Sequence, residues 1–364
     1  MSEERMRILE MVRDGKITAE EGARLLEALQ PKADAGAPGR GPGGVWDTDD
    51  PVRSIAGAVA QALQSGDWKG IMGQFAGSWS SGPLHGMERK QQRESDGWQF
   101  LSLSEGDKGT FELQSGDELL IEHEAGSIEA TAADGPARLE LHGEETHGYG
   151  VYVARKEKQV VVACHRTANY ARMPRLKLSV PRHVASVSER TAGGSLTAEA
   201  FSVPLKLRTA GGSIRVRQQS GADVNAKTSG GSIKVDGTPG RIDLHTSGGS
   251  ITFEGRTEAF DVKTSGGSVK IEGARLVTGE HSAKTSGGSV RVLLTRDSSV
   301  AVEAKTSAGS MNVDLPGAEG ERSGSKVSPR YSGKYGGGAA RLSLSTAAGQ
   351  VSVGLLGEEA AQAA

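Results

Sequence analysis

A seven-residue phrase, KTSGGSV, recurs along the chain and constrains its fold more than any other feature. It occurs in full at 263–269 and 284–290, and the serine after its glycine pair recurs every 18 to 21 residues. The seven consecutive units that carry the phrase or a near copy begin at Arg190, Arg208, Lys227, His245, Lys263, Lys284 and Lys305. Repetition at such a period is typical of solenoids, in which each unit buries its apolar face only by stacking on neighbours. Weaker copies at 123–130 and 345–353 extend the array over residues 98–356.

Each repeat has the pattern of two short strands. In the unit 212–230, apolar and polar residues alternate on both sides of an SGAD turn, which places Ile214, Val216 and Val224 inward. Aligning the units in chain order produces apolar columns that Glu189 interrupts, so the regular core is expected to start there. We therefore predict a mainly β protein, a β-solenoid or β-helix-like repeat with two short strands per 18–21-residue coil, plus a small N-terminal α-helical hairpin.

The glycine pair of each phrase marks a turn. Glycine adopts positive φ at little cost and lets successive coils approach closely. The threonine before the pair is placed to satisfy backbone groups of the turn with its hydroxyl. The glycines expected to form these turns are Gly193, Gly194, Gly211, Gly212, Gly230, Gly231, Gly248, Gly249, Gly266, Gly267, Gly287 and Gly288.

Composition divides the chain into five segments. Thr18 and Glu21 form a capping box between two apolar stripes, which predicts a helical hairpin that buries little surface and needs a protein partner or a second copy. The charge run ERKQQRE is expected to be solvated. The segments are 1–31, the helical hairpin for interaction or oligomerisation; 32–50, a Gly/Pro-rich linker; 51–97, an amphipathic helical or linker region; 98–356, the β-repeat domain; and 357–364, a disordered tail.

Charge and cysteine content exclude several classes of protein. The 364-residue chain has a net charge of −2, and acids outnumber bases in the hairpin, so nucleic acid is not an expected partner. One cysteine, Cys164, cannot form an intramolecular disulfide and is expected to be buried in a strand. The charged N-terminus lacks the apolar run of a signal peptide, which favours a cytoplasmic protein, with a peripheral position at the inner face of the membrane as a second option. Whether residues 45–80, rich in tryptophan and glycine, touch a membrane is left open.

Two outward columns of basic residues flank the turns. They form a candidate track for an anionic polymer or membrane surface, on which a ladder of weak contacts would supply avidity. The alternative is a solvated β-surface, because Glu199, Asp236, Glu254, Glu272 and Asp314 follow on the same outer face. The track consists of Arg190, Arg208, Lys227, His245, Lys263, Lys284 and Lys305 in one column and Arg215, Lys234, Lys270 and Arg291 in the other.

No pattern in the sequence predicts an enzyme. The histidines are scattered, and the glycine pairs lack the Lys-Ser/Thr that follows in a phosphate-binding loop. The turns carry serine where calcium-binding repeats need aspartate. We therefore predict no catalytic residues, no cofactor and no metal.

The TSGGS repeats, over roughly residues 98–356, resemble the DUF4097 β-strand repeat family of bacterial adhesin-like proteins. The segment ERMRILEMVRDGKITAEEGARLLEAL is similar to the short helical domain at the start of the YvlB and LiaX group. This resemblance implies a β-helix-like fold and, from LiaX-like members, a link to sensing of membrane-active antimicrobials and to control of a membrane-associated two-component system. It implies no catalytic residue.

Together these features predict a non-catalytic interaction protein of the bacterial cell-envelope stress response. Residues 1–31 would bind a protein partner or a second copy, and oligomers are possible. Two alternatives remain: a structural scaffold that assembles end to end, and an adhesin-like protein that binds polysaccharide.

Overall fold

The structure is a computed structural model that describes residues 83–103, 109–143, 149–166, 174–218 and 221–357. The predicted hairpin, the linker and residues 51–82 lie outside these ranges, as does the tail beyond residue 357. Helix α5 (Pro83–Ser95) precedes the strands. Within the described ranges, no helix has the length and apolarity needed to span a bilayer.

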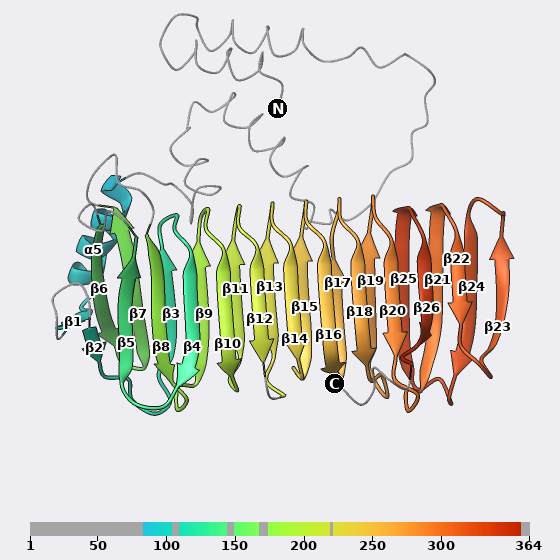
Figure 1. Cartoon of the computed structure of the whole chain (residues 1–364), viewed down its shortest axis with the longest axis horizontal. Helices are drawn as coiled ribbons and strands as arrows, with labels where there is room; N and C mark the ends of the chain where they lie inside the picture. The colour runs from blue at the N-terminus through green and yellow to red at the C-terminus, as the bar shows by residue number, and fades with distance from the viewer. Residues whose placement is uncertain (1–82, 104–108, 144–148, 167–173, 219–220, 358–364) are drawn as a thin grey trace, which may run out of the picture. The chain divides into compact units, whose positions relative to one another are not determined.

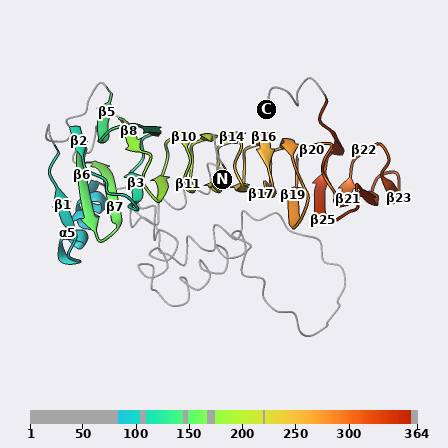
Figure 2. The ribbon, with the colours of Figure 1, turned by 90° about the horizontal axis from the view of Figure 1, so that it is seen from below.

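Two long sheets face each other and enclose the core (Figures 1 and 2). We name them sheet 1 and sheet 2. Sheet 1 consists, in spatial order, of β1 (Gln99–Leu101), β6 (Tyr149–Lys156), β7 (Gln159–Arg166), β3 (Glu118–His123), β9 (Ser186–Thr191), β11 (Leu205–Thr209), β13 (Val224–Thr228), β15 (Arg241–Thr246), β17 (Ala259–Lys263), β19 (Glu280–Thr285), β25 (Ala340–Ala348), β21 (Val300–Ala308), β24 (Pro329–Tyr335) and β23 (Glu319–Gly324). Sheet 2 consists of β2 (Gly109–Phe111), β5 (Ala137–His142), β8 (Arg175–Pro181), β4 (Ile128–Ala133), β10 (Leu196–Phe201), β12 (Ile214–Gln218), β14 (Ile233–Gly237), β16 (Ile251–Thr257), β18 (Val269–Ala274), β20 (Val290–Leu294), β26 (Val351–Leu355) and β22 (Met311–Asp314).

Parallel pairing in phase creates the core. Each coil contributes one strand to each sheet, and equivalent residues of successive coils lie opposite each other, as Ile214 and Ile233 do in sheet 2. Because side chains alternate along a strand, every second residue enters the core. Ile233, Leu244 and Phe253 are buried in this way. The predicted solenoid with two short strands per coil is confirmed.

The turns are built largely as the sequence predicts, with one correction. Thr264 Oγ1 donates a hydrogen bond to the Gly249 carbonyl of the preceding coil at 2.8 Å and accepts one from the Gly267 amide at 3.3 Å. The proposed positive φ is wrong, because none of the paired glycines adopts a left-handed backbone. A Cβ at Gly249 would instead lie 2.1 Å from the Gly231 carbonyl oxygen. The second glycine is thus required by the close approach of adjacent coils.

The coils do not stack in chain order near the C-terminus. We expected the unit at Lys305 to stack on the unit at Lys284, but β25 and β26 lie between them. The reason is that residues 345–353 are themselves a copy of the phrase: Thr346 Oγ1 donates to the Gly288 carbonyl at 2.7 Å. Thr306 Oγ1 then donates to the Gly349 carbonyl at 3.1 Å, which places the Lys305 unit one coil further out.

The N-terminal end of the array is rearranged too. β3 and β4 stack on β9 and β10, and β7 and β8 stack beyond them, before antiparallel strands end each sheet. We expected the core to start at Glu189, but it extends beyond this residue to β3 and β7. Its row continues from Leu207 through Glu189 to Ile121 and Val162, so the carboxyl group is enclosed between coils.

Candidate ligand-binding surface

The first basic column forms a row along the outer face of sheet 1. Strand register places Arg190, Arg208, Lys227, His245, Lys263 and Lys284 on successive strands, in the order predicted. We call this the first row. Ser345 of β25 then follows Lys284, so Lys305 is separated from the other members.

A second row, two residues earlier on each strand, determines which of these charges is neutralised. Over β15 and β17 it carries Asp243 and Asp261. Asp243 lies 3.0 Å from His245, and Asp261 lies 2.9 Å from Lys263. On β9, β11 and β13 the same row carries Ser188, Lys206 and Asn225 instead.

The column of Arg215, Lys234, Lys270 and Arg291 lies on the outer face of sheet 2, across the molecule from the first row. Lys234 is 3.2 Å from Glu254 and 3.4 Å from Asp236. Lys270 is 3.0 Å from Glu272. The two central lysines of this column are therefore paired as on an ordinary solvated β-surface.

Three basic residues without an acidic partner lie on the neighbouring strands β11 and β13 of sheet 1, and Lys284 further along the first row is likewise unpaired among the described residues. Among the residues that the structure describes, Lys206, Arg208 and Lys227 have no carboxylate within 4.0 Å, and Arg208 Nε is shielded from solvent without a hydrogen-bond partner. Arg190 beside them is 3.7 Å from Glu122. We call Arg190, Lys206, Arg208 and Lys227 the basic patch. Lys206 was missed by the sequence analysis because it belongs to a row that is acidic or neutral on the next strands.

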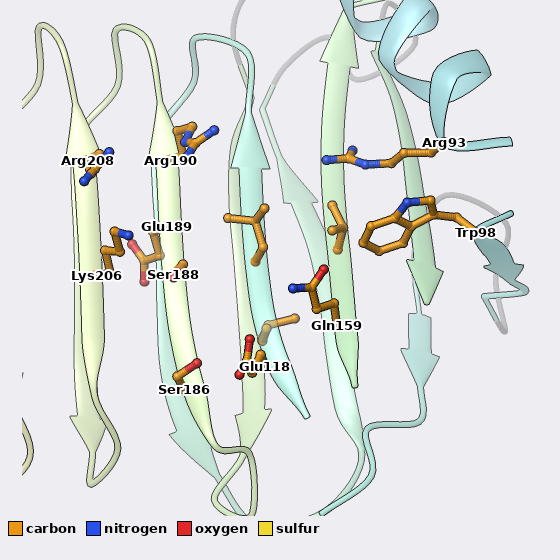
Figure 3. Close-up of a pocket in the computed structure, with 13 residues that line it drawn as sticks. Arg93, Trp98, Glu118, Gln159, Ser186, Ser188, Glu189, Arg190, Lys206 and Arg208 are labelled. Atoms are coloured by element: carbon orange, nitrogen blue, oxygen red, sulfur yellow. The ribbon is translucent and has the colours of Figure 1, made fainter. Parts of the chain in front are cut away.

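A cavity of about 270 Å³ adjoins the basic patch (Figure 3). Arg190, Lys206 and Arg208 border it on one side, and Trp98 and Arg93 border it on the other. Leu120 and Val161, on neighbouring strands, contribute apolar surface to its floor. The site thus combines fixed positive charge with an apolar hollow.

Helix α5 forms the far wall of this cavity. Arg93 of the predicted solvated run is largely buried instead, donating to Glu122 Oε2 at 2.9 Å and to the Tyr152 hydroxyl. Burial opposes the charge of Arg93, but Glu122 and Tyr152 outweigh it, and the pKa of the guanidinium is raised. Only a contact between segments 29 residues apart reveals this role, so the charge pattern alone could not find it.

One group on the first two rows has the composition of a metal site. Potential ligand atoms of Asp243, His245 and Asp261 lie within 4.8 Å of one another. Burial lowers the pKa of His245, an effect that Asp243 opposes and that Lys227 and Lys263 reinforce. Because Lys263 already donates to Asp261 and these cations repel a metal ion, we assign no metal here.

The stacked coils, the enclosed core and the outward charged rows define a β-solenoid repeat protein. Comparison with family models identifies a Toastrack DUF4097 domain over residues 156–354 and a SHOCT-like domain over residues 3–34. The chain belongs to the Toastrack DUF4097 family, as the resemblance of its repeats predicts. Neither matching family is described as an enzyme family.

Two solved structures match this chain at low similarity. One is described as a "putative cell adhesion protein" from Clostridium sporogenes; it is 10% identical, with 68% of this chain and 98% of that chain covered and a TM-score of 0.26. The other is described as a "putative adhesin" from Bacteroides fragilis; it is 13% identical, with 68% and 95% covered and a TM-score of 0.37. Comparison with curated proteins produced no significant match.

Proposed function

We propose that this protein is a non-catalytic interaction protein whose solenoid binds an anionic partner at the basic patch. The observation that carries the proposal is a cluster: Lys206, Arg208 and Lys227 lie together on β11 and β13 without an acidic partner among the described residues. Further along the row His245 and Lys263 are paired, and Lys284 is unpaired but lies between Lys263 and Ser345. Arginine offers a planar donor pair that matches carboxylate or phosphate groups. Several such contacts on a rigid sheet act together with little ordering cost.

The proposed function also includes a role for the N-terminal segment in binding a protein. A SHOCT-like domain matched at residues 3–34 would bind another protein or a second copy, while the solenoid binds the anionic ligand. The resemblance to LiaX-like proteins favours a role in cell-envelope stress sensing, in the cytoplasm or at the inner face of the membrane. Adhesin-like binding of an anionic polysaccharide is the alternative that the same patch supports, and end-to-end assembly is the third.

Charge reversal tests the patch. The full chain and the variant Lys206→Glu/Arg208→Glu are compared for binding to poly-L-glutamate, phosphatidylglycerol vesicles and alginate. The control Lys234→Glu/Lys270→Glu changes the same charge on the opposite sheet. We expect binding to at least one probe to weaken roughly tenfold or more in the patch variant alone, since a hydrogen bond to a charged group contributes about 1.5–3 kcal/mol.

The probe that binds separates the alternatives, because alginate alone would favour the adhesin-like function. Equal binding by wild type and both variants would overturn the proposal. In cells, replacing the gene by the patch variant should alter the response to a membrane-active antimicrobial as deletion of the gene does. An unchanged response would contradict the proposed role in stress sensing but would not affect the conclusion on binding by the patch.

A further inference from the structure

We propose that the cavity beside the basic patch binds an extended acidic peptide and accepts one of its large apolar side chains. This inference rests on the proposed anion binding and names the partner of the same site. Its first support is the unusual chemistry of the cavity floor. Leu120 and Val161 occupy the second row of the outer face, where the following strands carry Ser188, Lys206 and Asn225.

The apolar floor belongs to a cluster that α5 covers only in part. Tyr152, Ala154, Val161 and Ala163 form a small second core on the outer face of sheet 1, with Trp98, Phe100 and Leu120 packed against it. Arg93 ties α5 to this cluster, and its guanidinium lies 5.6 Å from the centre of the Trp98 ring. Leu120 and Trp98 remain half-buried at its margin. The partly exposed edge of this apolar cluster therefore lies beside the basic patch.

The first cavity alone has a volume that suits one large side chain. About 270 Å³ is below the range of roughly 300–1,000 Å³ that small-molecule sites occupy. A single aromatic or long aliphatic side chain can fill it. Burying such a side chain contributes about 1.5–3 kcal/mol, comparable with one charged hydrogen bond.

A second hollow extends the site along the sheet. Its volume is about 470 Å³, it shares Glu118, Ser186, Ser188 and Lys206 with the first cavity, and it reaches Asn225 and Asp243. From β7 to β13 there are four strand spacings, about 19 Å, which an extended peptide of about six residues spans. Lys206 lies on this path, and Arg190, Arg208 and Lys227 lie beside it on the side nearest the TSGGS turns, so carboxylates on one edge of the peptide would face these three residues.

The recessed floor distinguishes a peptide from the other anionic partners. A flat membrane meets the rim of a hollow but not its floor, and α5 packs on the outer face of β7 beside it (Figure 3). A carboxylated polysaccharide carries the charge but no large apolar side chain. An acidic peptide supplies both the carboxylates that the basic patch binds and a large apolar side chain for the hollow.

Selection from a phage-displayed library of 12-residue peptides on the full chain tests the inference. We expect enriched peptides to combine Asp or Glu with an aromatic or long aliphatic residue. Their affinity, measured by fluorescence anisotropy, should fall about tenfold or more in Ser188→Trp, which fills the cavity from the second row. The control Ser343→Trp places the same side chain in that row on β25, away from the cavity, and should bind like wild type.

Leu120→Ser provides a second variant that removes apolar floor without adding bulk, and it should weaken binding several-fold. Thermal unfolding by circular dichroism checks that each variant is folded. Selection without an acidic and apolar consensus, or unchanged affinity in both cavity variants, would overturn the inference. If Lys206→Glu/Arg208→Glu still loses its anionic probe in that case, the proposed function stands. Loss of phosphatidylglycerol vesicle binding in Ser188→Trp would show that the cavity binds lipid, and it would likewise overturn the inference of a peptide ligand.

Discussion

Glu189 is a single buried residue that lowers the stability of this fold. Both carboxylate oxygens are buried and have no hydrogen-bond partner among the described residues, and the row on either side is Ile121 and Leu207. Burial raises the pKa of Glu189 well above its usual value. We predict that Glu189→Leu increases the free energy of unfolding at pH 7 by about 2 kcal/mol, because an unpaired polar group leaves the core.

The same change should stabilise the protein less at pH 4. Below the unfolded-state pKa of about 4.3 both states hold the proton, so Glu189 adds no pH dependence there. As pH rises through that value, the unfolded state releases its proton while the folded state keeps it, and stability is lost up to the raised folded pKa. Urea unfolding at both pH values measures this difference. The control Glu303→Leu, on the exposed face of β21, should change stability by less than about 0.5 kcal/mol. If Glu189→Leu raises the free energy of unfolding equally at both pH values, the raised pKa of Glu189 is not the source of the gain.

At the scale of the coil, the two glycines of a pair have different tasks. A Cβ at Gly249 would lie 2.1 Å from a backbone oxygen of the neighbouring coil, whereas one at Gly248 would lie 3.3 Å from the nearest atom. We predict that Gly249→Ala lowers the free energy of unfolding by about 3 kcal/mol or more and Gly248→Ala by about 1 kcal/mol or less, because backbone overlap cannot be relieved by a rotamer change. Urea titration of both variants checks this, and equal losses would show that the coils separate easily.

The periodicity of the elements was predictable because each coil repeats the same local pattern. The inward columns and the threonine hydrogen bonds follow from it, and the buried Cys164 follows from the apolar run of its own strand. A further glycine column at Gly237, Gly255 and Gly273, with positive φ, was missed although each follows an acidic residue at the same register. The signal was present in the alignment, but the expected turn was assigned to the TSGGS phrase alone.

At the scale of the molecule, the site arises where repetition stops. The cavity lies where β3 and β7 stack out of chain order and α5 covers the outer face, so its lining comes from segments far apart in sequence. Column alignment assumes that successive units are neighbours. It therefore located Arg190 and Arg208 but could not place them beside Arg93, Trp98 and Leu120.

The spatial order at the other end can be tested with cysteine pairs on the outer face. Ser282 of β19 lies opposite Ser343 of β25, which in turn lies opposite Glu303 of β21. Adjacent strands are about 4.8 Å apart, within reach of a disulfide, whereas two spacings, about 9.6 Å, exceed the Cα separation of roughly 7 Å that a disulfide tolerates. In a Cys164→Ala background, Ser282→Cys/Ser343→Cys and Ser343→Cys/Glu303→Cys should each lose two free thiols on mild oxidation. Ser282→Cys/Glu303→Cys should keep both. Peptide mapping by mass spectrometry identifies the bonds, and a 282–303 disulfide in the folded monomer would restore stacking in chain order.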